Sequence, residues 1–316
     1  MSSIHQAIAF LGVATVGTPT VLAASPQTWH NHQLPQMLIV QTPSAENFLK
    51  QGLEKLRVGD KRGAVEDFNR ALQLKPDDIQ AYYERGVARV GLHDYNGAIK
   101  DWNEVVRLNP TVFIVYYNLG IAHIRIGDYQ GAIADYNRAI QLKPDCSVAY
   151  NNRGFSYIQL KDYKAAIEDF NMALEINQNW GDISPASAYV NRGIARSKLE
   201  DYQGAIADYQ RSIQFNSKNS LAYNNLGSIH LQLKDYKAAI EDFDMALKIN
   251  QNWGVVSPAI AYANRGIVRQ ALGDKQGAIN DYQTAATLFK QQGDEAKYQR
   301  VQELIRRLQQ QPGTIA

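Results

Sequence analysis

Side chains that commonly carry catalysis or metal binding are sparse in this sequence. Of its six histidines, His123 and His230 fall at equivalent places in two distant repeats, and His30-x-His32 is too short a pattern to define a metal site. The only cysteine, Cys146, excludes a disulfide framework within the chain and a multi-thiolate metal site. No phosphate-binding glycine loop, G-x-S-x-G elbow or H-E-x-x-H helix occurs. We therefore expect no enzyme activity, no metal and no cofactor.

Amide side chains, in contrast, recur at a fixed place two residues before a repeated glycine. That place holds Lys50 and Glu84 and then five asparagines: Asn118, Asn152, Asn191, Asn225 and Asn264. A carboxamide is both donor and acceptor, so a row of them could grip the N–H and C=O groups of an extended peptide. The alternative is that they bond within the fold, because buried amides require hydrogen-bond partners. Both interpretations stay open at this stage.

The glycine itself defines an internal repeat of seven units. It is spaced by 34 residues, except for two intervals of 39, and stands at Gly52, Gly86, Gly120, Gly154, Gly193, Gly227 and Gly266. An aromatic residue lies four positions before each glycine and another lies sixteen after it. An aspartate eight positions after each glycine predicts a short turn followed by the N-cap of a second helix.

Each unit is predicted to be a helical hairpin. In the third unit Tyr116, Gly120 and His123 fall on one helical stripe, and Ala132 and Tyr136 fall on another. We expect Gly120 to let the second helix approach at Ala132, with Tyr136 filling the space beyond. Neither helix buries its apolar stripe alone, so neighbouring units must stack.

The pattern resembles the tetratricopeptide repeat, whose 34-residue motif is W-x2-L-G-x2-Y, then A-x3-F, A and P. The third unit carries it almost in full, as Tyr116, Leu119, Gly120, Ala132, Tyr136, Ala139 and Pro144. The residue pattern of the repeats is similar to that of bacterial, notably cyanobacterial, members of the family. The resemblance implies an all-α, right-handed α-solenoid of seven hairpins, in which the first helices line a concave face that takes a peptide or a partner helix.

The repeats set the expected organisation of the chain. The seven units are predicted at residues 45–78, 79–112, 113–146, 147–180, 186–219, 220–253 and 259–292, which together span 45–292. Residues 293–316 follow as a C-terminal capping helix, expected over 294–310, and a tail. Residues 1–24 read as a signal peptide that lacks a positive start, and residues 25–44 as a linker or N-terminal cap. Export is thus expected, with a cytoplasmic chain, or one anchored by residues 7–24, as the alternative.

Two longer loops carry Trp180 and Trp253 in sequences that are nearly the same. Residues 159–174 match residues 232–247 except at Asn171 and Asp244, so a block of two units was duplicated. Each tryptophan either fills the gap left by its longer loop or contacts a partner.

Candidate groove residues other than the asparagines are aromatic: Tyr83, Tyr117 and Phe155, which favour an apolar peptide or amphipathic helix or else pack between helices. A mid-helix aspartate precedes the second aromatic in every unit, and we expect it to bond a first helix, with arginine as its partner where one precedes the repeat glycine. The net charge of +2 argues against nucleic acid. The predicted function is a non-enzymatic interaction scaffold or assembly factor, and the alternative is a structural protein that self-associates through the tryptophan loops and the terminal repeats.

Overall fold

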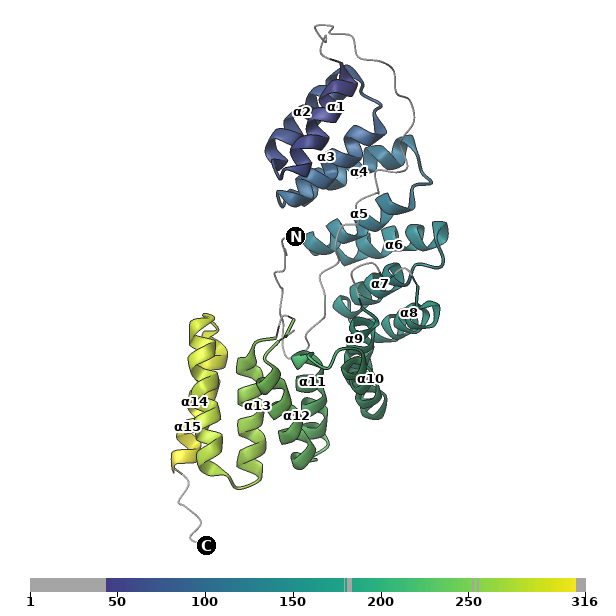
Figure 1. Ribbon diagram of the computed structural model, residues 1–316. Coiled ribbons are helices and arrows are strands. Elements are labelled where there is room, and N and C mark those ends of the chain that lie inside the picture. The colour runs from purple at the N-terminus through teal and green to yellow at the C-terminus, as the bar shows by residue number, and fades with distance from the viewer. Residues whose placement is uncertain (1–43, 179, 181–183, 252, 255, 311–316) are drawn as a thin grey trace. The chain divides into compact units, whose positions relative to one another are not determined.

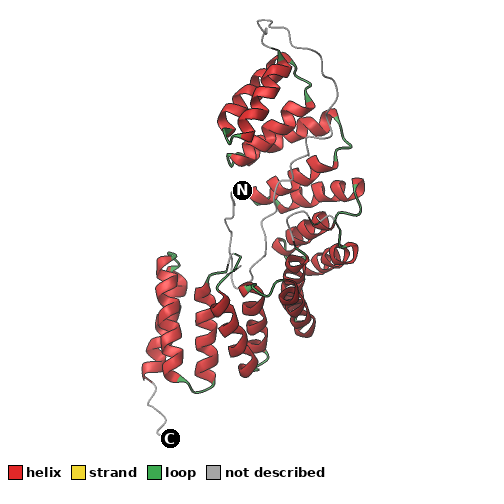
Figure 2. Ribbon diagram, viewed as in Figure 1, coloured by secondary structure: helices red, strands yellow, loops and turns green. Residues whose placement is uncertain are grey.

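The computed structural model describes residues 44–178, 180, 184–251, 253–254 and 256–310. Within these residues every regular element is an α-helix, and the described part of the chain contains no strand (Figure 2). The all-α fold class predicted from the repeats is confirmed. The predicted signal peptide at residues 1–24 lies outside the described residues, as does the linker up to residue 43.

The helices belong to two compact units, each built from several of the predicted hairpins (Figure 1). The first unit contains four hairpins, built from α1 (Ala45–Arg57), α2 (Lys61–Leu74), α3 (Ile79–Gly91), α4 (Tyr95–Leu108), α5 (Phe113–Ile126), α6 (Tyr129–Leu142), α7 (Ser147–Gln159) and α8 (Tyr163–Ile176). Each odd-numbered helix packs against the helix that follows it, and the second helix of each of the first three hairpins packs against the first helix of the next.

The second unit contains three hairpins and one further helix. Its elements are α9 (Pro185–Lys198), α10 (Tyr202–Phe215), α11 (Ser220–Gln232), α12 (Tyr236–Ile249), α13 (Pro258–Ala271), α14 (Lys275–Gln291) and α15 (Glu295–Gln310). The last helix packs on α14 through Val301, Ile305 and Leu308, which are buried in one cluster with Tyr282 and Phe289. It therefore covers the apolar side of the final hairpin, as expected of a capping helix.

The core of each hairpin is a glycine under an aromatic ring. A Cβ placed on Gly120 would lie 2.7 Å from the ring of Tyr136, which is fully buried. The expectation that Tyr136 fills a space beyond Gly120 is therefore wrong in detail, because the glycine makes room for the ring itself. The same pair recurs in every hairpin, and the second-helix rings are at most 2% exposed: Phe68, Trp102, Tyr136, Phe170, Tyr209, Phe243 and Tyr282.

Each turn between the two helices of a hairpin has one backbone design. The residue seven positions after the glycine has positive φ, and it is Gly59, His93, Gly127, Lys161, Glu200, Lys234 or Gly273. The next residue is the predicted aspartate, whose side chain accepts a hydrogen bond from the N–H three residues on. The N-cap prediction is thus confirmed in all seven hairpins.

The tryptophans are held by their own loops. The Nε1 of Trp180 donates to Asn177 Oδ1 at 3.0 Å, and that of Trp253 donates to Asn250 Oδ1 at 2.9 Å. Both asparagines end a second helix with φ of 48°. Trp253 also packs against the core cluster that contains Phe243, which fits its predicted gap-filling role.

A serine that only these two hairpins carry fastens the start of each loop. Ser147 N donates to Gln178 O at 3.1 Å, and Gln178 N donates to Ser147 Oγ at 3.0 Å. Ser220 and Gln251 repeat both bonds at 3.0 Å. Both serines are fully buried, so the bonds satisfy polar groups that water does not reach.

The turn geometry predicts opposite effects for two substitutions in the first unit. Gly127→Ala, at φ 81°, should lower the free energy of unfolding by about 1 kcal/mol because a Cβ is strained in the left-handed region. Lys161→Gly, at φ 63°, should raise it by about 0.5 kcal/mol by removing the same strain. Urea unfolding followed by circular dichroism measures both, and two shifts of the same sign would contradict this account.

Candidate functional site

Arginines on the first helices of four hairpins fix those helices against the second helices. Arg85 Nη2 donates to Asp101 Oδ1 at 2.6 Å and its Nε donates to Asp101 Oδ2 at 3.0 Å. Arg89 Nη1 adds a bond to Asp101 Oδ2 at 2.7 Å. Asp101 is 2% exposed, so these bonds compensate a buried carboxylate. The corresponding pairs elsewhere are Arg153–Asp169, Arg192–Asp208 and Arg265–Asp281, and in the first hairpin Lys55–Asp67.

The same guanidinium groups also link one hairpin to the one before it. Arg85 Nη1 donates to Asn69 Oδ1 on α2 at 2.7 Å, and its guanidinium carbon lies 5.3 Å from the centre of the Tyr82 ring. Arg265 repeats the arrangement with Asp244 of α12, at 2.6 Å. The expected role of the mid-helix aspartates is confirmed. The one difference between residues 159–174 and residues 232–247, Asn171 against Asp244, falls at this linking position.

Histidine replaces arginine in the third and sixth hairpins. There the residue before the repeat glycine is Leu119 or Leu226, and the aspartate is bonded instead by His123 or His230. His123 Nδ1 lies 2.7 Å from Asp135 Oδ2, and His230 Nδ1 lies 2.6 Å from Asp242 Oδ2. Because a carboxylate accepts, Nδ1 is the protonated nitrogen in each pair.

Both pairs lie partly away from water, and their surroundings shift the pKa of His123, Asp135 and Asp242. The hydrogen bond to Asp135 raises the pKa of His123, and burial raises the pKa of Asp135. Burial likewise raises the pKa of Asp242 to about 6. These histidines therefore serve the packing of their hairpins, and the signal that could have revealed it was the leucine in place of arginine.

The predicted asparagine row lies between successive first helices. Asn118 Nδ2 donates to Tyr83 Oη and Asn152 Nδ2 donates to Tyr117 Oη, both at 3.2 Å. In the second unit Asn264 Nδ2 donates to Ser228 Oγ at 3.5 Å. The alternative of bonds within the fold is thus confirmed for these members.

Four of the five asparagines are buried, with at most 4% of their surface exposed: Asn118, Asn152, Asn191 and Asn225. Asn264 is half-buried. Of the aromatic candidates, Tyr83 and Tyr117 are buried together with their asparagines, whereas Phe155 on α7 is half-buried. Contact of these residues with a partner stays a prediction. The structure brings Tyr83 and Asn118 together, and also Tyr117 and Asn152, which the sequence considered only as separate rows.

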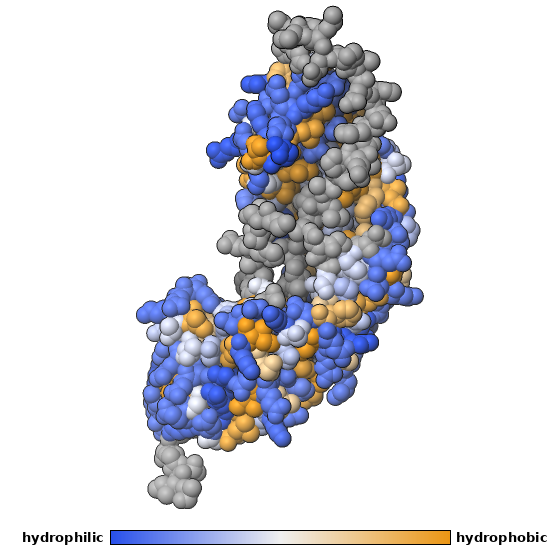
Figure 3. All heavy atoms as spheres, in the orientation of Figure 1, coloured by the Kyte–Doolittle hydropathy of each residue, from blue (hydrophilic) through white to orange (hydrophobic). Residues whose placement is uncertain are grey.

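The apolar residues one position after the repeat glycine differ in the exposed fraction of their surface. Ile121 and Ile194 are buried, whereas Leu53, Val87 and Phe155 are half-buried and Ile267 is 39% exposed. The visible surface of both units is mainly hydrophilic with smaller hydrophobic patches (Figure 3). At this repeat position the accessible apolar surface is therefore contributed by Leu53, Val87, Phe155 and Ile267.

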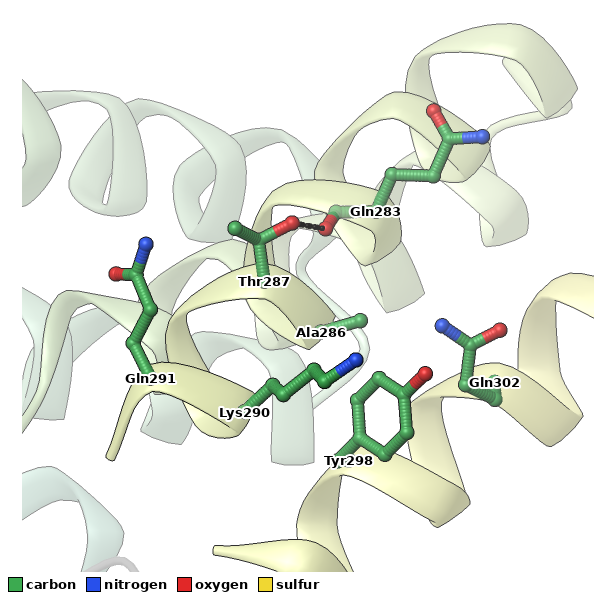
Figure 4. A pocket seen from close by; sticks show the side chains of 7 residues that line it. All are labelled: Gln283, Ala286, Thr287, Lys290, Gln291, Tyr298 and Gln302. Atoms are coloured by element: carbon green, nitrogen blue, oxygen red, sulfur yellow. Dashed lines mark hydrogen bonds between the residues drawn. The ribbon is translucent and has the colours of Figure 1, made fainter. Parts of the chain in front are cut away.

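A cavity of about 510 Å³ lies between α14 and α15. Lys290, Tyr298 and Gln302 face its space, and the Lys290 Nζ lies 5.7 Å from the centre of the Tyr298 ring (Figure 4). The lining otherwise consists of amide, hydroxyl and alanine side chains. Among the described residues, no group of three histidine, cysteine or acidic side chains is placed to hold a metal ion.

Tetratricopeptide repeat models match residues 49–111, 113–146, 147–179, 186–219 and 220–252, which is more than half of the chain. Together with the stacked hairpins, these matches place the chain in the tetratricopeptide repeat family. No match is found among curated protein sequences.

Several solved structures share this fold. A tetratricopeptide repeat protein from Parabacteroides merdae is 18% identical with a TM-score of 0.60, covering 84% of this chain and 98% of its own. The type IV pilus biogenesis factor PilW is 18% identical with a TM-score of 0.58, covering 68% and 94%. MamA is 24% identical with a TM-score of 0.51, covering 55% and 92%. At these identities the similarity concerns the fold.

Removal of a clamped carboxylate should cost far more than removal of a helix cap. Asp101→Ala leaves Arg85 and Arg89 without their shared partner, and we expect a loss of about 3–5 kcal/mol in the free energy of unfolding. Asp94→Ala, which removes the N-cap of α4 and a more exposed ion pair of 3.7 Å with Arg89, should cost about 1 kcal/mol. Denaturant unfolding of both variants tests this, and equal losses would show that the clamp has no special weight.

The third hairpin should lose stability as the pH rises. Because the pKa of His123 is raised in the folded chain, its contribution is complete below its unfolded pKa and disappears as pH rises through the folded pKa. His123→Arg supplies the permanent charge that Arg89 supplies in the second hairpin. Thermal midpoints from pH 6 to 8 should therefore fall more steeply in the wild type than in this variant, and parallel curves would refute the assignment.

Proposed function

We propose that this protein is an interaction scaffold or assembly factor that binds a peptide or a helix along the first helices of its hairpins. Membership of the tetratricopeptide repeat family supports a protein or peptide partner, because stacked repeats present extended surfaces of this kind. We also propose that the chain acts without catalysing a reaction and without a cofactor.

The observation that carries the proposal is the set of apolar side chains that stay accessible after the repeat glycine. Leu53, Val87 and Phe155 are half-buried on α1, α3 and α7 of one unit, so part of each ring or chain remains open to a ligand. A partner with apolar side chains would cover this surface, as grooves do when they take amphipathic helices or extended peptides.

Within this proposal the asparagine row supports the binding face from beneath. The bonds from Asn118 and Asn152 to tyrosines on the preceding helices fix the distance between first helices. Asn264, which is half-buried, is the member best placed for direct contact with a bound backbone. Self-association through the tryptophan loops is not favoured, because both indole N–H groups are already bonded within their loops.

The described residues include no helix that is both long and apolar enough to cross a membrane. From the sequence of residues 1–24 we propose that the protein is exported. A fusion of these residues to alkaline phosphatase, which is active only after export, would test this, and an inactive fusion would argue against it.

A matched pair of substitutions in the fourth hairpin tests the binding face. Phe155→Ser removes a half-buried ring from the first helix, and Met172→Ser removes a side chain that is 40% exposed on the second helix. After a partner is identified by photo-crosslinking from position 87, calorimetry should show at least about tenfold weaker binding for Phe155→Ser. Met172→Ser should bind as the wild type does. Equal affinities for all three would overturn the proposed face.

A further inference from the structure

Glu84 is the acidic member of a row that otherwise holds one lysine and five asparagines. It lies on α3 between Tyr83, which is buried, and Arg85, which is bonded to Asp101. Its side chain is half-buried, and burial raises the pKa of this carboxyl to about 7. A carboxylate in such surroundings requires a compensating positive charge or donor.

The first helix before it offers no such donor. At this position in the next two hairpins, Asn118 bonds the hydroxyl of Tyr83, and Asn152 bonds the hydroxyl of Tyr117. The residue that corresponds to these tyrosines on α1 is Leu49, which is apolar and 9% exposed. The position on α1 that corresponds to these tyrosines therefore offers Glu84 a hydrocarbon side chain in place of a hydroxyl group.

The neighbouring cations are engaged elsewhere. Arg85 is held by Asp101 and by Asn69, at 2.6 and 2.7 Å. Lys50 pairs with Glu46 at 3.0 Å, and Lys55 pairs with Asp67 at 2.6 Å. Among the contacts of the described residues, no hydrogen bond or ion pair reaches the Glu84 carboxylate.

We propose that Glu84 receives a lysine or arginine side chain of the peptide or helix that binds to the first helices. The half-buried Leu53 and Val87, one position after the repeat glycine on α1 and α3, would take aliphatic side chains next to that cation. This inference rests on the proposed function and specifies its partner: a segment in which a basic residue stands beside aliphatic ones. A cation in this position supplies the charge that the first helices do not.

Selection from a random library of 12-residue peptides displayed on phage, against the full chain at pH 8, provides the probe. We expect the selected peptides to share a lysine or arginine beside aliphatic residues. A synthetic peptide of the shared sequence should bind Glu84→Gln at least about tenfold more weakly than the wild type. Replacing its basic residue by norleucine should weaken binding to the wild type by the same factor and leave binding to Glu84→Gln unchanged.

Glu66→Gln, which alters an exposed carboxylate on α2, is the matched control and should bind as the wild type does. Circular dichroism should show a melting temperature for Glu84→Gln that is equal to or higher than that of the wild type, since an uncharged amide is easier to bury. If the basic and norleucine peptides bind the wild type equally, the role of Glu84 is refuted while the proposed function stands. If no peptide is selected by the wild type, the proposed function fails and the inference fails with it.

Discussion

The contact between an aspartate of the second helix and a basic side chain of the first helix, most often arginine, is the constraint on which each hairpin depends. The aspartate lies within the second helix, where it is at most 4% exposed in five hairpins and half-buried in the third and sixth. In the first hairpin Arg70 of the same helix also reaches Asp67. The charge of the aspartate can be tolerated only if a cation from the first helix reaches it. The guanidinium of Arg85 also bonds Asn69 of the preceding hairpin, so one side chain fixes both the pairing of two helices and the stacking of two hairpins.

Where this arginine is absent, the fold compensates with weaker chemistry. His123 and His230 hold their aspartates by one ring nitrogen each, and the leucines at the vacated positions form no bond to the hairpin before them. Each unit therefore contains one hairpin that lacks the guanidinium bond to the hairpin before it and is held internally by a titratable pair. The duplication of a two-hairpin block placed a tryptophan loop in both units, together with the serine that bonds the start of that loop. The loop and its serine were therefore duplicated together.

Much of the fold could be predicted from the sequence, because its determinants are local and repeated seven times. The glycine, the aromatic residue sixteen positions on and the capping aspartate each recur in register, so one wrong unit could not obscure the pattern. The candidate site was harder. Whether Asn118 faces a ligand or a neighbouring helix depends on the tyrosine 35 positions earlier, and no helical periodicity within one unit contains that information. The sequence signal for this contact lay in comparing neighbouring hairpins, which pairs Tyr83 with Asn118 and Tyr117 with Asn152.

The same comparison between hairpins distinguishes side chains that bond neighbouring hairpins from side chains that are available to a partner. Where asparagine lies opposite tyrosine, as in Asn118–Tyr83 and Asn152–Tyr117, a hydrogen bond joins the two first helices and engages the amide N–H within the fold. Where glutamate lies opposite leucine the position differs, since among the described residues no hydrogen bond or ion pair compensates the carboxylate of Glu84. Repetition makes this departure visible: a position that is structural in most units becomes a candidate for recognition where its partner residue has changed.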